Sequence, residues 1–170
     1  MSVVSAELVA AVRRGFALEW RGIHGVWHWT RVRENGLCLA EMTGANCEVV
    51  ELFAVLHDSK RANDRRDPGH GQRAAAFIKS LRGTLIVVDD AAFEQLIYAC
   101  AFHTDGLVEA DVTVQTCWDA DRLDLGRVNI APQAEYLCTA PAKEPALIAW
   151  AYRRSRQEPP DGLPEWIGPS

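Results

Sequence analysis

A histidine and an aspartate stand side by side at positions 57 and 58, directly after the apolar run Phe-Ala-Val-Leu at 53–56. Neighbouring residues of a helix point roughly 100° apart, so both side chains reach one ion only where the helix ends or is distorted. The charged segment 59–68 that follows supplies such an end. Imidazole and carboxylate together suit zinc, iron or manganese, whereas carboxylates alone favour magnesium or calcium. His57 and Asp58 therefore predict a metal site where a buried helix meets a loop.

Further metal-type side chains are distributed along the chain, at His24, His28, His70, His103, Asp119 and Asp121. His24 and His28 are four residues apart, so on a helix they share one face. The same spacing occurs in zinc proteases, which need a glutamate directly after the first histidine as a general base. That position is Gly25 here, and we reject the protease interpretation. A lone histidine is more often an ordinary hydrogen-bonded residue, so the adjacent His-Asp pair carries more weight than any single histidine.

Composition is that of a globular protein. The 170 residues suit one domain that buries roughly two-thirds of its unfolded surface, and we assign residues 1–157 to it. The formal net charge of −5 gives no reason to expect a nucleic acid polymer or an anionic membrane as a partner. Five scattered cysteines without a Cys-x-x-Cys pair indicate reduced thiols and a cytoplasmic location. Neither a membrane span nor a signal peptide is expected from the apolar pattern.

The spacing of apolar residues predicts an all-α fold, with helices over about 6–20, 25–43, 47–56, 72–81, 90–103, 112–125 and 146–156. Ser5, Asn46, Asp89 and Asp111 are suitable N-caps, and Gly44 and Gly83 are suitable ends. The helix before His57 is apolar nearly all round, so it belongs in the centre of a bundle.

The remaining segments are expected to be irregular. The run Leu-Ile-Val-Val at 85–88 is interpreted as an apolar connector or the start of a helix, although it could be a short strand. Segment 130–145 contains three prolines and is expected to hold at most one helical turn. The Pro- and Gly-rich tail 158–170 is expected to be extended or mobile, although Trp166 and Ile167 could dock on the domain.

Three segments together resemble the HD-domain superfamily of metal-dependent phosphohydrolases, over about residues 22–128. Gly-Ile-His-Gly-Val-Trp-His-Trp-Thr-Arg-Val at 22–32 looks like the helix of the first ligand, in which a histidine precedes an arginine and a valine. Ala-Val-Leu-His-Asp at 54–58 looks like the central His-Asp motif, and Asp-Ala-Asp-Arg-Leu-Asp at 119–124 looks like the closing motif. The resemblance implies an HD-domain-like helical bundle of the bacterial small single-domain hydrolase type.

Carried over by motif, the four metal ligands of this superfamily fall on His28, His57, Asp58 and Asp121. Asp121 is preferred to Asp119 because the matching ligand directly precedes a basic residue, here Arg122. The resemblance implies that Arg122 faces a substrate phosphate and that Asp119 orients a histidine or a loop. His24 resembles an extra histidine of bacterial members and is expected to line the substrate pocket, although Gly25 replaces the aspartate of their motif.

Dinuclear members of the superfamily hold a second metal with a histidine that opens the helix after the His-Asp motif and another at the end of the following helix. His70 and His103 have comparable places, and Asp58 could bridge the two ions because a carboxylate has two oxygens. Alternatively, His70 only begins its helix, and His103 contacts substrate or lies behind the metal ligands. The expected cofactor is one divalent ion, manganese, zinc, iron or magnesium, with a second ion left open.

The resemblance implies hydrolysis of a phosphate ester by a water that the metal activates. Lys60, Arg61, Arg31 or Arg122 would neutralise charge that develops on the phosphoryl oxygens. Segment 59–67 carries four basic residues beside the motif, although it could equally be a solvated loop balanced by its aspartates. Some HD nucleotidases have a glutamate at the position of Arg61, so a carboxylate that activates water, if one is needed, must be Asp64, Asp67 or Asp119.

We therefore expect a metal-dependent phosphohydrolase of a small phosphorylated molecule, with a nucleotide as the leading substrate. The aromatic residues Trp27, Trp29, Trp118 and Phe102 flank proposed ligands and could stack on a base, although core packing is the commoner use of such residues. A dinuclear-iron HD-type oxygenase would use the same ligands with His70 and His103, and a metal-containing module that only binds a nucleotide is a third alternative. Ligand order determines neither the metal, the substrate nor the oligomeric state.

Overall fold

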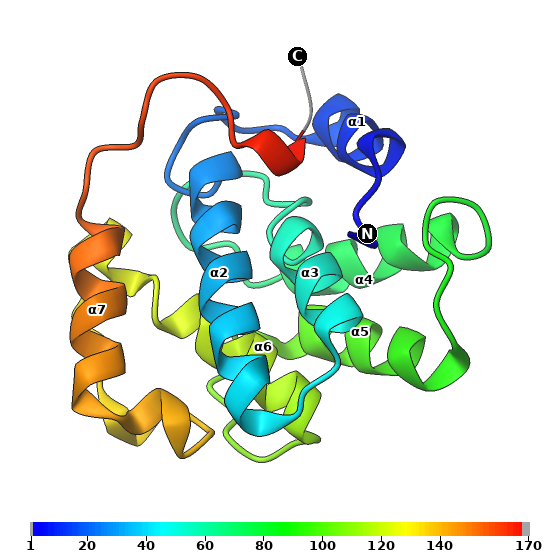
Figure 1. Cartoon of the computed structure of the whole chain (residues 1–170). Coiled ribbons are helices and arrows are strands. Elements are labelled where there is room, and N and C mark those ends of the chain that lie inside the picture. The colour runs from blue at the N-terminus through cyan, green and yellow to red at the C-terminus, as the bar shows by residue number, and fades with distance from the viewer. Residues whose placement is uncertain (1, 168–170) are drawn as a thin grey trace.

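The computed structural model describes residues 2–167 (Figure 1). Within that range the chain forms seven α-helices and four short 3-10 helices, and pairs backbone in a β-bridge only between Arg82 and Ile86. The α-helices are α1 (Ala6–Gly15), α2 (Val26–Thr43), α3 (Cys47–Leu56), α4 (His70–Leu81), α5 (Asp90–Phe102), α6 (Val112–Arg122) and α7 (Pro145–Ser155). The 3-10 helices are η1 (Leu125–Val128), η2 (Ala134–Tyr136), η3 (Pro141–Lys143) and η4 (Glu165–Ile167). The prediction of an all-α bundle is confirmed.

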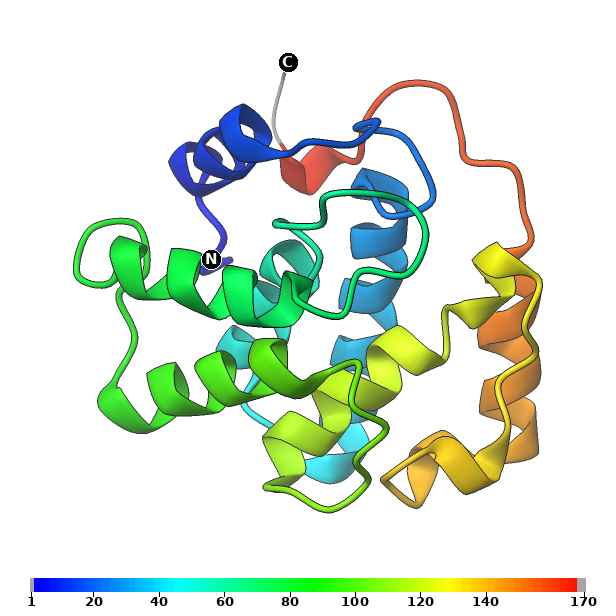
Figure 2. The ribbon, with the colours of Figure 1, turned by 180° about the vertical axis from the view of Figure 1, so that it is seen from behind.

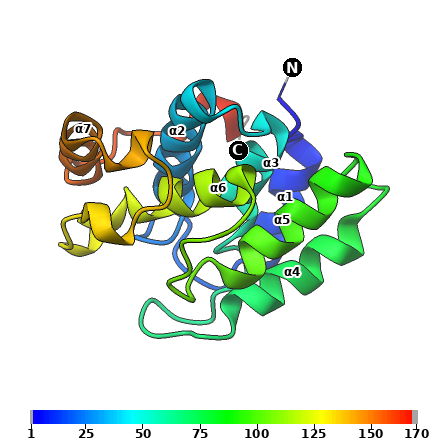
Figure 3. The same ribbon diagram turned by 90° about the horizontal axis from the view of Figure 1, so that it is seen from below.

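Helix α3 is the centre of the bundle. Its residues 49–56 are all buried, as the apolar sequence predicts, and the Asn46 side chain accepts hydrogen bonds from the first backbone N–H groups. Helix α2 packs along α3, and α5 and α6 contact it from other sides (Figure 3). Each buried leucine, valine or phenylalanine of this core contributes on the order of 1.5–3 kcal/mol, so α3 ends at a rigid place.

Two glycines let helices that carry ligands approach closely. A Cβ atom on Gly36 of α2 would lie 2.5 Å from Val50 Cγ1 of α3 and 3.3 Å from Ala120 Cβ of α6. A Cβ atom on Gly71 of α4 would lie 2.6 Å from the carbonyl oxygen of Cys100 in α5. Both contacts are too short for any side chain, and they set the distances across which residues of α2, α4, α5 and α6 meet.

Several predicted boundaries were wrong. Helix α1 ends at Gly15 and not at Trp20, because Phe16 turns into extended backbone and its ring packs edge-on against the rings of Trp20 and Trp29. Helix α6 ends at Arg122, and Gly126 lies inside η1. Segment 130–145 contains two helical turns, η2 and η3, where at most one was expected. The prediction for 85–88 holds in its first form: the segment is a connector, in which Leu85 ends a turn, Ile86 is buried, and 87–88 precede α5 as irregular backbone.

The C-terminal segment returns to the bundle at residues 163–167, whereas residues 156–162 are exposed, and residues 168–170 of the predicted tail lie outside the described range. Ile167 is buried, and the Trp166 indole N–H donates to the Thr30 hydroxyl on α2 at 3.2 Å. The Arg21 guanidinium donates to the carbonyl of Pro160. Contact of Trp166 and Ile167 with the domain was one of the two expected outcomes for this segment. No helix of the described chain is both long and apolar enough to cross a membrane.

Candidate metal centre

The His-Asp pair lies at the end of α3, as predicted. His57 is the C-cap residue of α3, keeps helical backbone angles and is fully buried, and Asp58 is only 2% exposed. The His57 ring also stacks on Phe53, with centroids 4.8 Å apart. The ring Nδ1 donates to the carbonyl oxygen of Phe53 at 3.0 Å, one turn back along α3. The helix therefore fixes the ring and leaves the other nitrogen, Nε2, free to face its neighbours.

A first group of ligand-type atoms forms on one side of Asp58. The Nε2 atoms of His28 and His57 are 3.0 Å apart. Asp121 Oδ1 lies 3.3 Å from His28 Nε2 and 3.7 Å from His57 Nε2. Asp58 Oδ2 lies 3.6 Å and 3.7 Å from the same two nitrogens. The structure thus brings together the four residues predicted as ligands, from α2, the end of α3 and α6.

A second group forms on the other oxygen of Asp58. His70 opens α4 and His103 follows the last residue of α5. Their Nε2 atoms are 2.9 Å apart and lie 3.0 Å and 3.5 Å from Asp58 Oδ1. His57, Asp58 and His103 also offer atoms within 4.8 Å of one another. Asp58 stands between the two groups with one oxygen toward each, which is the arrangement that a bridging carboxylate needs.

Hydrogen bonds on the far side of the rings determine which nitrogen is protonated. The Nδ1 atoms of His57, His70 and His103 each face a backbone carbonyl, which can only accept, and His28 Nδ1 faces the carboxylate of Asp124 at 2.6 Å. Each Nδ1 therefore carries a proton, and in the neutral ring Nε2 presents a lone pair. Four such lone pairs and three carboxylate oxygens converge in a buried space. They repel one another unless a cation lies among them, so the donor set fits metal binding.

One further atom supports this fit. Asp121 Oδ1 is buried and has no hydrogen-bond partner within the described residues. An unpartnered buried carboxylate oxygen is costly, because its hydration is lost without compensation. A metal ion coordinated by that oxygen would supply the missing partner.

The charges of the cluster are set by burial and by mutual contact. Burial would raise the pKa of Asp58, but electrostatic interaction with His57 and close contacts with other histidines outweigh it and hold that pKa well below its usual value. Burial would likewise raise the pKa of Asp121, and its close contact with His28 lowers it instead. Burial lowers the pKa of His57 to about 3. The cluster therefore offers carboxylates and a neutral imidazole at neutral pH, which are the protonation states of metal ligands.

Asp124 is a further candidate site residue that the sequence did not identify. Its carboxylate is 1% exposed, accepts from His28 Nδ1, and receives two hydrogen bonds from the Arg31 guanidinium at 2.6 Å and 3.1 Å. Such a carboxylate fixes the orientation of a metal-ligating histidine. The available signal was its position three residues after Asp121, which puts both side chains on one side of a helical turn. The prediction that Arg31 binds substrate is corrected, because its guanidinium holds Asp124.

The closing motif also differs from expectation. Arg122 donates to the backbone carbonyls of Leu107 and Tyr136, so the prediction that it faces a substrate phosphate is corrected. Adjacent helical residues diverge by about 100°, and Asp121 already takes the direction of the cluster. The arginine beside Asp121 is instead Arg127, whose Nη2 lies 3.8 Å from Asp121 Oδ1.

Asp119 does not reach a histidine and serves the loop alone. Its two fully buried carboxylate oxygens accept from the backbone N–H groups of Cys138 and Thr139 and from the Thr139 hydroxyl, at 2.7–2.8 Å. These three bonds occupy the carboxylate, which corrects its expected place among the catalytic residues. Of the two roles predicted for it, orienting a histidine or a loop, the structure shows the second.

Of the predicted residues near the His-Asp motif, one lies away from the cluster and two contact Asp58. Lys60 places its ammonium 3.8 Å from the centroid of the Phe77 ring on α4, which corrects its expected position beside the reacting phosphate. Arg61 remains at the cluster, with Nη1 3.7 Å from Asp58 Oδ1 and 3.3 Å from His70 Nε2. His24 precedes α2, and its Nδ1 lies 3.0 Å from Asp58 Oδ2.

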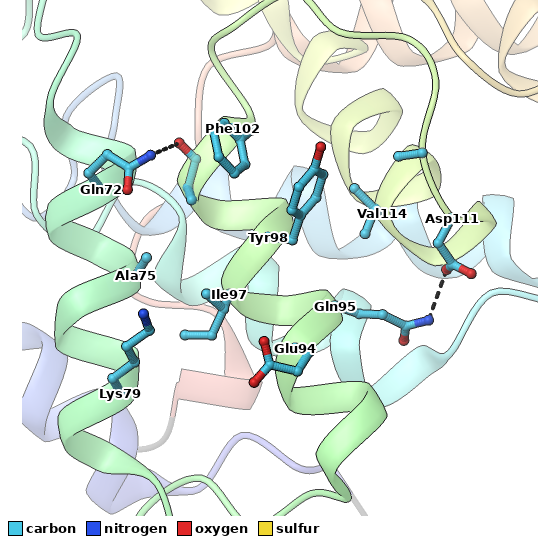
Figure 4. Close-up of a pocket in the computed structure, with 12 residues that line it drawn as sticks. Gln72, Ala75, Lys79, Glu94, Gln95, Ile97, Tyr98, Phe102, Asp111 and Val114 are labelled. Carbon is cyan, nitrogen blue, oxygen red and sulfur yellow. Dashed lines mark hydrogen bonds between the residues drawn. The ribbon is translucent and has the colours of Figure 1, made fainter.

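Cavities border the helices that carry the cluster. One has a volume of about 430 Å³ and is lined by Arg61, His70 and residues of the loop that joins α3 to α4. Figure 2 shows the course of that loop. The other, of about 530 Å³, is a groove on the outer face of α4, α5 and α6, and Figure 4 shows Tyr98 and Phe102 along it. The lining of the second groove includes none of the ligand-type residues of the cluster. The first cavity shares Arg61 and His70 with the cluster and is therefore a candidate approach to the metal centre.

Comparison with known proteins finds similarity at the level of structure. No protein-family model matches the chain, and no curated protein matches it. The crystal structure of a predicted HD superfamily hydrolase from an uncultured Thermotogales bacterium superposes with a TM-score of 0.66 at 25% sequence identity. The match covers 86% of this chain and 84% of that one.

Proposed function

The chain has the HD-domain fold, and from that premise we propose that it is a metal-dependent hydrolase that cleaves phosphate esters of small molecules. The hydrolase name of the structural neighbour and the buried His/Asp cluster support a metal-dependent hydrolase in general. The phosphate ester as substrate is supported by the arginines at both ends of the cluster, Arg61 and Arg127, because guanidinium groups match phosphoryl oxygens well.

We propose that two ions bind. His28, His57 and Asp121 would hold one ion, His70 and His103 the other, and Asp58 would bridge them. A divalent metal in such a site lowers the pKa of a bound water and polarises a phosphoryl oxygen. Manganese, zinc, iron and magnesium remain the candidates, and the four imidazoles favour the first three.

The protein's own residues would orient the bridging carboxylate and neutralise charge on the substrate. His24 contacts the same Asp58 oxygen that faces the first group, so it holds the bridging carboxylate in place. Arg61 and Arg127 stand beside the second and first groups, where positive charge would stabilise negative charge that develops on phosphoryl oxygens. The histidines of the two groups are only 0 to 5% exposed. This burial keeps bulk water away from the ligands and strengthens these interactions.

The observation that carries the proposal is the convergence of four Nε2 lone pairs on the two oxygens of Asp58. The same observation favours a second candidate, a dinuclear-iron HD-type oxygenase, because that chemistry also needs two adjacent ions. Oxygen consumption by the iron-loaded protein separates the two candidates: two irons per chain together with consumption of oxygen would favour the oxygenase.

The test is release of phosphate from p-nitrophenyl phosphate and a panel of phosphorylated small molecules, with each candidate metal supplied in turn. The proposal predicts turnover that Asp58→Ala abolishes together with bound metal. Asp90→Asn is the matched control, because that side chain is 93% exposed on α5, and it should keep both. Metal-loaded protein that hydrolyses no phosphate ester, or an Asp58→Ala variant that retains its metal in full, would overturn the proposal.

A further inference from the structure

The loop between α3 and α4 places a cluster of cations over one end of the metal centre. The cavity beneath it is lined by Arg61, Arg65, Arg66, Asp67, Pro68, His70, Thr104 and Asp105. His70 belongs to both the cavity and the ligand cluster, so the cavity opens directly onto the second group. A molecule that reaches the cluster through this opening passes the arginines.

The charge of this cavity is positive, although the chain as a whole carries −5. Three arginines face two aspartates in its lining. One of those aspartates, Asp67, is already engaged by the Arg73 guanidinium at 2.5 Å and by the backbone N–H of Ala62 at 2.8 Å. Its carboxylate therefore does little to cancel the arginines, and the local field attracts anions.

The three arginines take two different positions. Arg61 is buried, and it donates to the carbonyl oxygens of Asn63 and Arg65, so the loop wraps around its guanidinium next to Asp58. The backbone N–H of Arg65 in turn donates to the Asn63 side chain at 2.8 Å. Arg65 and Arg66 are exposed at the outer rim. The loop thus holds an inner cation at the metal centre and two outer cations farther from it.

The lining also argues against an aromatic base. Pro68 is the one hydrophobic residue among the eight, and no aromatic ring is present apart from the imidazole of His70. Trp29 and Trp118, which could have stacked on a nucleobase, are fully buried in the core. A nucleobase in this cavity would lack the apolar, stacking surface that such rings usually occupy.

We propose that the loop 59–69 forms a second anion site, and that the preferred substrates are small, non-aromatic phosphate esters with a second anionic group. This proposal rests on the proposed hydrolase function. The metal centre and Arg61 receive the phosphoryl group to be cleaved, and Arg65 and Arg66 receive the second group, a phosphate or a carboxylate. A nucleoside monophosphate, with one anionic group and a base, fits this site less well.

Binding of phosphonates that cannot be hydrolysed tests the second anion site independently of turnover. The probes are propylphosphonate, propane-1,3-diphosphonate and 3-phosphonopropanoate, whose P–C bonds resist hydrolysis, titrated calorimetrically into the metal-loaded protein. At least one of the doubly anionic probes should bind roughly ten-fold or more tightly than propylphosphonate, as charge-assisted bonds to arginine would provide. The probe that gains affinity identifies the second group as phosphate or carboxylate.

The double variant Arg65→Ala/Arg66→Ala should reduce the ratio of the two affinities, doubly anionic probe over propylphosphonate, to near one. The matched control, Lys143→Ala/Arg153→Ala, removes two exposed positive charges near α7 and should preserve it. Equal or absent binding of the three probes to the wild-type protein, or a ratio that survives in the double variant, would overturn the second anion site. Failure of every phosphate ester to turn over would instead overturn the hydrolase proposal and leave these binding ratios standing.

Turnover then tests the substrate class directly. In a panel that pairs glucose 6-phosphate with glucose 1,6-bisphosphate and includes AMP, the bisphosphate should have the highest kcat/KM, mainly through a lower KM. The Arg65→Ala/Arg66→Ala variant should lose this preference. A preference for AMP would contradict the proposal while it supported the phosphohydrolase.

Discussion

Replacing Asp124 by asparagine should weaken metal binding without removing any ligand. The Asp124 carboxylate is 1% exposed and accepts from His28 Nδ1 at 2.6 Å. Burial would raise its pKa, but hydrogen bonding with His28 and the charge of Arg31 lower it, so Asp124 is an anion at neutral pH. The asparagine removes that charge and makes His28 a weaker electron donor to the metal.

Loss of such a supporting carboxylate typically costs 10- to 100-fold in metal affinity, or about 1.4 to 2.8 kcal/mol. We expect a value in that range for Asp124→Asn, since the bond is short, charged and fully buried. Arg31 also loses its partner, so the variant should unfold at a lower temperature.

The assay is competition for metal against a chromophoric chelator, at a temperature where circular dichroism shows the variant folded. Asp90→Asn is the control and should bind metal as the wild-type protein does. If Asp124→Asn binds metal within about two-fold of wild type, Asp124 does not position His28 and the assignment is wrong.

Three further predictions concern packing, thiols and pH. Gly71→Ala should lower both the unfolding temperature and the metal affinity, because the added Cβ would meet backbone of α5. Gly69→Ala is the control, because its Cβ would meet only the movable end of an arginine side chain. Equal losses of unfolding temperature in the two variants would contradict this prediction. A thiol reagent should label the exposed Cys47 in the native protein, but should label Cys117 only after unfolding, because burial raises the pKa of that thiol; early labelling of Cys117 would refute its burial. Burial lowers the pKa of His57 to about 3. Below about pH 6.5 the unfolded chain therefore binds a proton at His57 that the folded chain does not bind. The metal-free protein should accordingly lose stability as pH falls from about 6.5 to 4. His57→Asn should flatten that dependence in thermal melts, and an unchanged slope would contradict it.

The helices and the identity of the clustered ligand-type residues were predictable because their signals are local. Asn46 and Gly44 mark the turn between α2 and α3, and the apolar sequence before His57 requires burial on every side. The family motifs then indicated which histidines and aspartates belong together. The structure adds that Asp58 turns one oxygen toward each group, which depends on where α4 and α5 end relative to α3.

The directions of the long basic side chains were not predictable. Lys60, Arg31 and Arg122 were each expected near a phosphate, but each found a closer partner in a ring, a carboxylate or a backbone carbonyl. Those partners lie far away in sequence, so local pattern does not reveal them. The sequence did not identify Asp124 for the same reason, because its contact with His28 spans 96 residues.

The metal content of the purified, metal-loaded protein tests the central claim most directly. Inductively coupled plasma mass spectrometry should find two ions per chain in the wild-type protein. His103→Gln removes one ligand of the second group only, so it should leave one ion per chain. A single ion in the wild-type protein, or two ions in the His103→Gln variant, would contradict a two-metal centre bridged by Asp58.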